Sequence, residues 1–254
     1  MTQTLLETDA LTVRFGGHVA VDAVSCSFRA GELTAIVGPN GAGKTTYFNL
    51  ISGQVPASSG TVKLMGEDIT RLGVAGRCRR GLGRAFQLTN LFPSLTVLEN
   101  VRLVIQSRQH KGFGLFSMAD SHTELTVAAM AILERVRLDT QKDQLVSELP
   151  HGDQRKLEVA LLIGLDPTVY MFDEPTAGMS VDEAPVILDL IAEIKADRER
   201  TVLLVEHKLD VIRSLADRII VLHNGALAAD GPPAEVMASA VVQEAYMGKE
   251  LDHV

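Results

Sequence analysis

A glycine-rich segment that follows an apolar run most strongly constrains how this chain can fold. The run ELTAIVG (32–38) is typical of a buried strand that ends at a loop, and a helix is expected from about 43 to 52. Between them the sequence fits G-x-x-x-x-G-K-[ST], with the residues Gly38, Pro39, Asn40, Gly41, Ala42, Gly43, Lys44, Thr45 and Thr46. A strand, this loop and a helix in that order predict a phosphate-binding loop.

The residue types in this loop suit a nucleotide. Glycines let backbone N–H groups turn toward phosphate oxygens, and the following helix adds its positive N-terminal end. Lys44 would bridge the β- and γ-phosphates, and the Thr45 hydroxyl would bind Mg²⁺. The segment therefore predicts a site for a nucleotide and its magnesium ion.

Further polar residues follow two other apolar runs. Asp173 and Glu174 come directly after VYMF (169–172), at the end of a predicted parallel strand, where ligands of such sheets bind. Asp173 suits Mg²⁺, directly or through water, and Glu174 suits the orientation or deprotonation of an attacking water. His207 follows the run 201–206; a γ-phosphate contact and a purely structural role are equally well supported for it.

The remaining patterns predict an α/β domain with a helical insertion. Helices alternate with strands in the C-terminal third, which favours a mostly parallel sheet. The segment between these α/β parts has helical spacing of apolar residues, with Thr96 as an N-cap. The expected strands cover 11–15, 20–28, 61–65, 168–172, 201–206 and 218–223, the expected helices 95–106, 122–138, 182–196 and 208–216, and a loop 111–120.

Composition excludes several classes of protein. Lys and Arg number 24 against 32 Asp and Glu, a net charge of −8, and there is no Trp, which argues against a general nucleic-acid binder. No apolar run approaches the about 20 residues of a membrane helix, and no secretory leader is visible. Cys26 and Cys78 lack metal-ligand spacing and are expected to be reduced thiols. The basic run 77–80 is expected to be a solvated face or a subunit contact.

These motifs, in this order, resemble the nucleotide-binding domain of ABC transporters over nearly the whole chain. The resemblance implies an α/β P-loop NTPase of ABC type that binds ATP with Mg²⁺ and hydrolyses ATP. It also implies a RecA-like, mostly parallel sheet core with an antiparallel β subdomain, formed by 1–87 and 161–254. A helical subdomain, 88–160, would be inserted into this single domain of 1–254.

The resemblance also implies roles for individual residues. Phe15 in VRFGG would stack on adenine, and Gln87 in GRAFQ would contact Mg²⁺ and the attacking water. Asp173 and Glu174 match the metal-binding aspartate and the catalytic glutamate, and His207 matches the switch histidine. The segment 88–92 is expected to receive a helix of a membrane subunit, with local core packing as the alternative.

The signature segment departs from the family pattern. The common LSGGQ aligns with 149–153, where Gly152 is kept and would face the γ-phosphate on a partner subunit. Pro150 and Asp153 replace the serine and the glutamine, and Ser180 replaces the aspartate of the D-loop. An acidic side chain near a phosphate is unfavourable unless it points away. Weak ATP-driven dimerisation of the isolated chain is therefore expected.

Within the family, several segments are most similar to the larger ATP-binding subunit of branched-chain amino acid importers: VRFGGHVAVDAVS, GLGRAFQLTNLFPSLTVLENV, KGFGLF, DEPTAGM, VEHKLDVI and EAYMG. The partners implied are two integral membrane permease subunits, a second ATP-binding subunit in a homo- or heterodimer, and a solute-binding protein, with no nucleic acid. The location implied is the cytoplasmic face of the inner membrane.

Other functions stay open at this point. A urea or short-amide importer has very similar ATPases, and a non-transport cytosolic ABC ATPase is a further alternative. A different P-loop enzyme, such as a kinase, does not account for Gln87, the segment 149–155 and His207 together. The transported solute is not determined by this chain.

Overall fold

The computed structural model describes residues 3–85, 91–108 and 118–239, with side chains in all of these except 118–122. The chain forms two compact units. The first comprises Met1–Leu82, Thr168–Glu174 and Ile194–Val254, and the second comprises Gly83–Pro167 and Pro175–Glu193. Within the described residues, no helix combines the length and the apolar character needed to cross a membrane.

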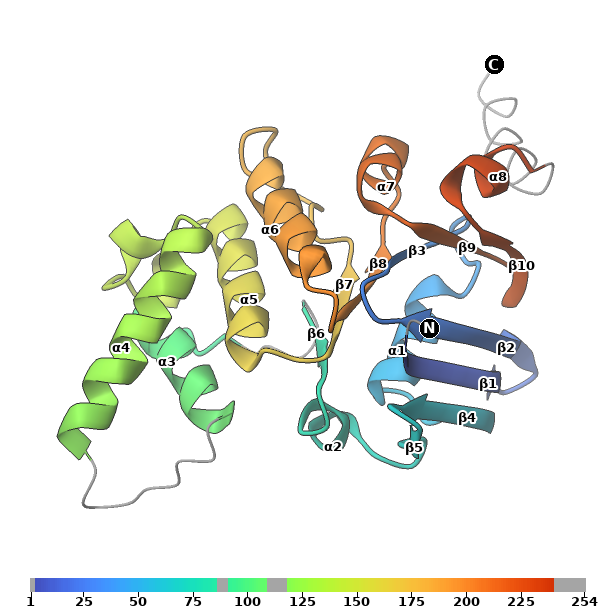
Figure 1. Ribbon diagram of the computed structural model, residues 1–254, viewed down its shortest axis with the longest axis horizontal. Helices are drawn as coiled ribbons and strands as arrows, with labels where there is room; N and C mark the ends of the chain where they lie inside the picture. The colour runs from blue at the N-terminus through green and yellow to red at the C-terminus, as the bar shows by residue number, and fades with distance from the viewer. Residues whose placement is uncertain (1–2, 86–90, 109–117, 240–254) are drawn as a thin grey trace. The chain divides into compact units, whose positions relative to one another are not determined.

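The described residues form two sheets, whose strands belong to the first unit except for Gly83 and Arg84 of β6 (Figure 1). One has the strand order β2-β1-β4-β5 and is antiparallel; the other has the order β10-β9-β3-β8-β7-β6. In the second sheet β9, β3, β8 and β7 run parallel, as expected, while β10 is antiparallel to β9. The strands are β1 (Thr4–Phe15), β2 (His18–Arg29), β3 (Leu33–Val37), β4 (Ser59–Leu64), β5 (Glu67–Asp68), β6 (Leu82–Arg84), β7 (Val169–Asp173), β8 (Thr201–Val205), β9 (Arg218–His223) and β10 (Ala226–Gly231).

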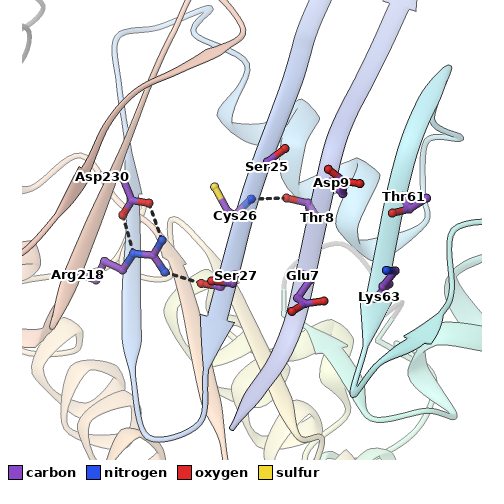
Figure 2. Close-up of a pocket in the computed structure, with 10 residues that line it drawn as sticks. All are labelled: Glu7, Thr8, Asp9, Ser25, Cys26, Ser27, Thr61, Lys63, Arg218 and Asp230. Carbon is purple, nitrogen blue, oxygen red and sulfur yellow. Dashed lines mark hydrogen bonds and ion pairs between the residues drawn. The ribbon is translucent and has the colours of Figure 1, made fainter. Parts of the chain in front are cut away.

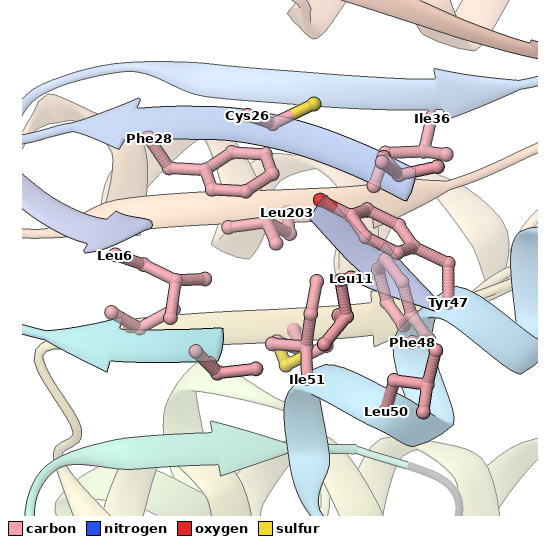
Figure 3. Close-up of a cluster of buried hydrophobic side chains, with 14 of the residues drawn as sticks. Leu6, Leu11, Cys26, Phe28, Ile36, Tyr47, Phe48, Leu50, Ile51 and Leu203 are labelled. Carbon is pink, nitrogen blue, oxygen red and sulfur yellow. The ribbon is translucent and has the colours of Figure 1, made fainter. Parts of the chain in front are cut away.

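The main core of this unit surrounds helix α1 (Lys44–Ser52). Figure 3 shows Tyr47, Phe48 and Ile51 of this helix among side chains of both sheets, including Leu11 of β1 and Leu203 of β8. Burial of such side chains stabilises the fold by roughly 1.5–3 kcal/mol each. The helix that follows the glycine loop is therefore fixed by the packing of both sheets against it.

A smaller core lies on the other face of the parallel strands, which two C-terminal helices cover (Figure 1). Ile212 of α7 (Leu209–Leu215) and Val236 of α8 (Pro233–Met237) pack against Val37 of β3 and Val221 of β9. The strands are therefore buried on both faces, which explains why they read as continuous apolar runs rather than as alternating patterns.

The second unit is helical. It contains three helices that pack against one another: α3 (Val97–Arg108), α4 (Met118–Arg135) and α5 (His151–Leu165). The unit also includes most of α6 (Ala184–Ala196), up to Glu193. Thr96 begins α3 as predicted: its Oγ1 accepts the N–H of Glu99 at 3.2 Å, and its own N–H donates to Glu99 Oε2 at 2.8 Å. This reciprocal pair is a capping box.

Two sequence-based expectations need correction. The loop expected over 111–120 is wrong at its end, because Met118–Asp120 already belong to α4; residues 111–117 lie outside the described part of the chain. The basic run 77–80 is not simply a solvated face, because Arg77, in the short helix α2 (Val74–Cys78), is buried. Apolar periodicity could not reveal a buried arginine, since its partners are backbone carbonyls.

Arg77 closes the C-terminal end of α1. Its Nη1 donates to the carbonyls of Leu50 and Ile51, both at 2.6 Å, its Nε donates to Leu72 at 2.9 Å and its Nη2 to Thr70 at 2.8 Å. Burial lowers the pKa of Arg77 to about 10, so the guanidinium stays charged at neutral pH. A cation here meets the negative end of the α1 dipole and satisfies carbonyls that the helix itself leaves unpaired.

We expect Arg77→Met to lower the free energy of unfolding by about 3 kcal/mol, because several buried carbonyls lose a charged donor at once. Urea denaturation followed by circular dichroism measures this change. Arg79→Met, in an exposed neighbour, is the matched control and should change stability by no more than about 0.5 kcal/mol. Equal losses in the two variants would contradict the structural role given to Arg77.

Candidate active site

Three neighbouring parallel strands end at the same level in the first unit. Val205 of β8 is in register with Ile36 of β3 on one side and with Asp173 of β7 on the other. The carboxyl ends of adjoining parallel strands form the ligand-binding edge of such a sheet. The glycine loop after β3, the acidic pair after β7 and His207 after β8 therefore meet at one edge, as the sequence predicts.

The glycine loop needs glycine for a steric reason. Gly43, immediately before α1, has φ +96°, and a Cβ there would lie 2.5 Å from the carbonyl oxygen of Ala20. Gly41 also has a positive φ, +82°, but no atom lies within 4 Å of the Cβ position. Both residues have a conformation that L side chains rarely adopt, and at Gly43 a close approach of another chain segment adds a second restriction.

Lys44 is buried, and its position is set by the loop itself. Its Nζ donates to the carbonyl oxygens of Gly38 at 2.7 Å and Pro39 at 3.0 Å. The ammonium group is thereby held against the start of the loop that precedes α1. An ammonium and a helix N-terminus together favour an anion at this place.

A pocket of about 300 Å³ lies over this loop. It brings together most of the residues predicted from the motif with Glu174 and His207, and it adds two residues that the motif did not indicate, His18 and Ala20 of β2. Its lining residues are His18, Ala20, Asn40, Gly41, Ala42, Gly43, Lys44, Thr45, Thr46, Glu174 and His207. The only signal for His18 and Ala20 was their place in the segment VRFGGHVAVDAVS.

Glu174 and His207 contact each other in this pocket. The Nε2 atom of His207 lies 2.8 Å from Oε1 of Glu174. Because an ionised carboxylate only accepts hydrogen bonds, a bond from His207 to an ionised Glu174 requires a form of the imidazole with a proton on Nε2. Glu174 has φ +51°, an uncommon value for a residue with a side chain, and its N–H donates to Val205 at 2.9 Å. The backbone of Glu174 is thus bonded to β8 at the end of β7, and its carboxylate contacts the histidine.

Two other predicted site residues, Asp173 and Phe15, are not among the described residues that line this pocket. Asp173 ends β7 next to Glu174. Phe15 ends β1, in the hairpin whose second strand provides His18 and Ala20, and 51% of Phe15 is exposed. Gln87 lies outside the described residues, as do Leu88, Thr89 and Asn90 of the segment 88–92.

The signature segment forms the start of α5 in the second unit. Pro150 is the N-cap residue, its carbonyl accepts the N–H of Gln154 at 3.0 Å, and Nε2 of Gln154 donates to Leu149 at 3.0 Å. The carboxylate of Asp153 accepts from Nζ of Lys156 at 2.8 Å, and these side chains are only 15% and 12% exposed. Proline at a helix start is thus accommodated, and the charge of Asp153 is balanced by Lys156.

Glu183 connects this helix start to the segment before α6. Its Oε2 accepts the N–H of Ser180 at 2.9 Å, and its Oε1 is 3.9 Å from Nζ of Lys156. The hydrogen bonds to Ser180, followed by the charge of Lys156, lower the pKa of Glu183. The carboxyl group of Glu183 also lies 2.2 Å from the position where a side chain at Gly152 would begin, so a larger residue at 152 would displace the end of the Glu183 side chain.

A larger depression of about 450 Å³ lies on the strands of the antiparallel sheet and beside β9 and β10 (Figure 2). Arg218 donates to both oxygens of Asp230 at 2.6 Å and to the carbonyl of Ser27, and this pairing raises its pKa. The thiol of Cys26, at the same place, has its pKa raised to about 11 by burial. These groups link β2 with the β9–β10 hairpin, and nothing about them points to a ligand.

The strand ends and their pocket place the chain in the class of P-loop ATP hydrolases, and comparison with known proteins narrows that class. A family model described as ABC transporter matches residues 21–177, and a second, described as branched-chain amino acid ATP-binding cassette transporter, matches residues 227–252. The chain belongs to the ABC transporter family and is an ATP-binding cassette of that family.

Curated relatives agree with this assignment. The chain is 38% identical to the high-affinity branched-chain amino acid transport ATP-binding protein LivG of Salmonella typhimurium, over 98% of this chain and 100% of LivG. It is 35% identical to the corresponding protein BraF of Pseudomonas aeruginosa, with the same coverage.

Solved structures show the same fold. An ATP-binding cassette of an ABC transporter in its ADP conformation has a TM-score of 0.81 and 31% identity, over 97% of this chain and 100% of that one. A dimeric cassette in a post-hydrolysis state bound to ADP and Pi has a TM-score of 0.77 and 25% identity, over 90% of this chain and 99% of that one.

We expect Gly43→Ala to abolish measurable ATP binding, because the added Cβ forces the loop away from the carbonyl of Ala20. Gly41→Ala is the matched control: it carries the same kind of positive φ but meets no atom, so it should cost about 1 kcal/mol of backbone strain and weaken ATP binding by less than about tenfold. Isothermal titration with ATP compares the two variants. Equal effects on affinity would show that the close approach to Ala20 is unimportant.

Proposed function

We propose that this chain is the ATP-hydrolysing subunit of an importer for branched-chain amino acids. The observation that carries the proposal is the hydrogen-bonded pair of Glu174 and His207 in one pocket with the phosphate-binding loop. The names of the relatives and the family model matched at 227–252 support the choice of solute class.

ATP would bind with its phosphates on the loop 38–46. Backbone N–H groups and Nζ of Lys44 would neutralise the phosphate oxygens, with the ammonium exchanging its carbonyl partners for phosphate. Phe15, exposed at the end of β1, would stack on adenine.

The residues present fit a magnesium ion. Mg²⁺ prefers oxygen ligands and commonly uses one or two protein groups together with substrate phosphates. The hydroxyl of Thr45 lines the pocket, the carboxylate of Asp173 ends β7, and Gln87 is proposed as a further ligand. A bound Mg²⁺ would supply charge neutralisation at the phosphate oxygens.

Hydrolysis requires a water aligned with the bond that breaks. Glu174 would orient this water and accept its proton, because its carboxylate faces the pocket at the end of β7. The imidazole of His207 donates to Glu174 and would hold its carboxylate in one orientation, while also lying within reach of the γ-phosphate. Catalysis of this kind is chiefly positioning and electrostatic stabilisation.

A second ATP-binding subunit would complete each site. We propose that the start of α5, with Gly152, meets the γ-phosphate of a nucleotide held by that partner, in a homo- or heterodimer. Because Lys156 pairs with Asp153, the electrostatic reason for expecting weak ATP-driven dimerisation is smaller than the sequence alone indicates.

The second unit offers a surface for a membrane subunit. A groove of about 250 Å³ runs along α3 and is lined by Leu95, Glu99, Arg102, Leu103 and Gln106. Nearby in the sequence, Asn100 is buried and hydrogen-bonds the backbone of Phe92 in both directions, at 2.9 and 3.2 Å, while 52% of Phe92 stays exposed. Phe92 is therefore not in the core, and we propose that this face receives a helix of a permease subunit.

The remaining parts of the proposal follow from this assembly. Two permease subunits and a solute-binding protein would form the importer, and this chain would sit peripherally on the cytoplasmic face of the inner membrane. We propose that the functional division of the chain is a core of 1–87 and 161–254 with a helical subdomain of 88–160.

Glu174→Gln should lower kcat for ATP hydrolysis by about 10²–10⁴-fold, because the amide cannot accept the proton of water. The affinity for ATP should change little, since the loop contacts persist. Steady-state phosphate release and ATP titration measure the two quantities. Glu199→Gln, at an exposed position, is the control; unchanged hydrolysis in Glu174→Gln would refute the catalytic role.

Leu103→Glu should remove the permease subunits from a tagged pull-down out of detergent-solubilised native membranes, because a charge replaces one of the two leucines that line the groove. ATP affinity should be retained. Val127→Glu, which changes an equally apolar and 64% exposed residue on α4, should leave recovery unchanged. Identification of the recovered proteins by mass spectrometry also tests the importer itself: recovery of ribosomal or DNA-repair proteins in place of permeases would contradict the proposed function.

A further inference from the structure

Glu206 is a buried acidic residue to which the mechanism above gives no part. It follows β8 directly and is only 3% exposed, although it carries a carboxylate. Burial of a carboxylate costs free energy unless hydrogen bonds compensate for lost water. A glutamate at this position therefore needs a structural reason.

The contacts of Glu206 supply that reason. Its Oε2 accepts the N–H of His207 at 2.7 Å and the N–H of Lys208 at 3.3 Å. Both N–H groups belong to the turn that leads from β8 into α7. Hydrogen bonds from backbone N–H groups to a carboxylate are stronger than bonds between neutral groups, so they restrict the backbone of this turn.

The same turn carries the imidazole that contacts Glu174. His207 is held at its backbone by Glu206 and reaches Glu174 with its Nε2 at 2.8 Å. Glu174 is itself held at its backbone, through the bond of its N–H to Val205 at 2.9 Å. The two members of the pair are thus fixed by consecutive residues, Val205 and Glu206, at the end of one strand.

We propose that Glu206 is a positioning residue for ATP hydrolysis. Its carboxylate fixes the turn at 207–208, so that the imidazole of His207 meets the carboxylate of Glu174 in the orientation that hydrolysis requires. The inference rests on the roles proposed above for Glu174 and His207. Small displacements of a catalytic group lower the rate much more than they lower binding, which gives the proposal a kinetic signature.

The decisive variants differ in their acceptor atoms. Glu206→Met fills a similar volume but accepts no strong hydrogen bond, while Glu206→Gln keeps an oxygen at about the same place and loses only the charge. An apolar side chain adds no desolvation cost at a buried position, so Glu206→Met is expected to fold; Glu206→Ala serves as the second acceptor-free variant. Circular dichroism and thermal denaturation establish folding for each.

The primary measurement is the ¹⁵N and ¹H NMR spectrum of the His207 imidazole. The protein has 7 histidines, and the signals are assigned with His207→Gln. In Glu206→Met these signals should move toward those of a solvent-exposed histidine, and in Glu206→Gln they should stay near their positions in the unchanged protein. Unmoved His207 signals in folded Glu206→Met would overturn the proposal whatever the kinetics show.

Kinetics supply the second measurement. Glu206→Met should lower kcat about 10–100-fold with KM for ATP within about twofold, and Glu206→Gln should recover most of kcat. Equal losses of kcat and ATP affinity in Met and Gln variants would indicate a general structural role and would also overturn the proposal. His207→Ala separates the proposed role of His207 in hydrolysis from the positioning of its turn by Glu206. If this variant hydrolyses ATP normally, the role proposed for His207 fails. The NMR measurement still decides whether Glu206 positions the turn.

Discussion

The burial of α1 between two sheets is the constraint on which the first unit depends. Tyr47, Phe48 and Ile51 are completely buried, so packing fixes the position of the helix. The loop that leads directly into this helix is fixed with it. Lys44 begins this helix, and its ammonium is fixed by the loop carbonyls that it contacts. Arg77 closes the opposite end of the same helix. The ammonium of Lys44 is thus held in place in part by the apolar packing of α1, several residues away.

The placement of residues that follow apolar runs could be predicted from the sequence. The glycine loop, Glu174 and His207 each stand at the end of an apolar run, and parallel strand order brings them into one pocket. Arg77 and Glu206 could not be predicted in this way. Both are charged residues buried against backbone groups, and the partners of Arg77 lie as far as 27 positions away in the sequence. Periodicity records apolar faces and carries no signal for such contacts.

The signature segment shows how a changed motif can keep its local chemistry. The sequence predicts an unfavourable carboxylate at Asp153, but three residues further along α5 Lys156 pairs with it, and Glu183 connects this pair to Ser180. The absence of a side chain at Gly152 leaves the carboxylate of Glu183 in its place beside the start of α5. A motif comparison that considers one position at a time misses this compensation, because charge balance belongs to the group of side chains.

The positive φ of Glu174 has a consequence for how this protein can change over time. A side chain in that region of backbone space costs roughly 1–2 kcal/mol, and glycine would avoid the cost. Glycine at this position would therefore favour the stability of the fold and, under the role proposed for Glu174, would yield a protein that binds ATP without hydrolysing it. The backbone at this position thus favours a residue other than the one on which the proposed chemistry depends.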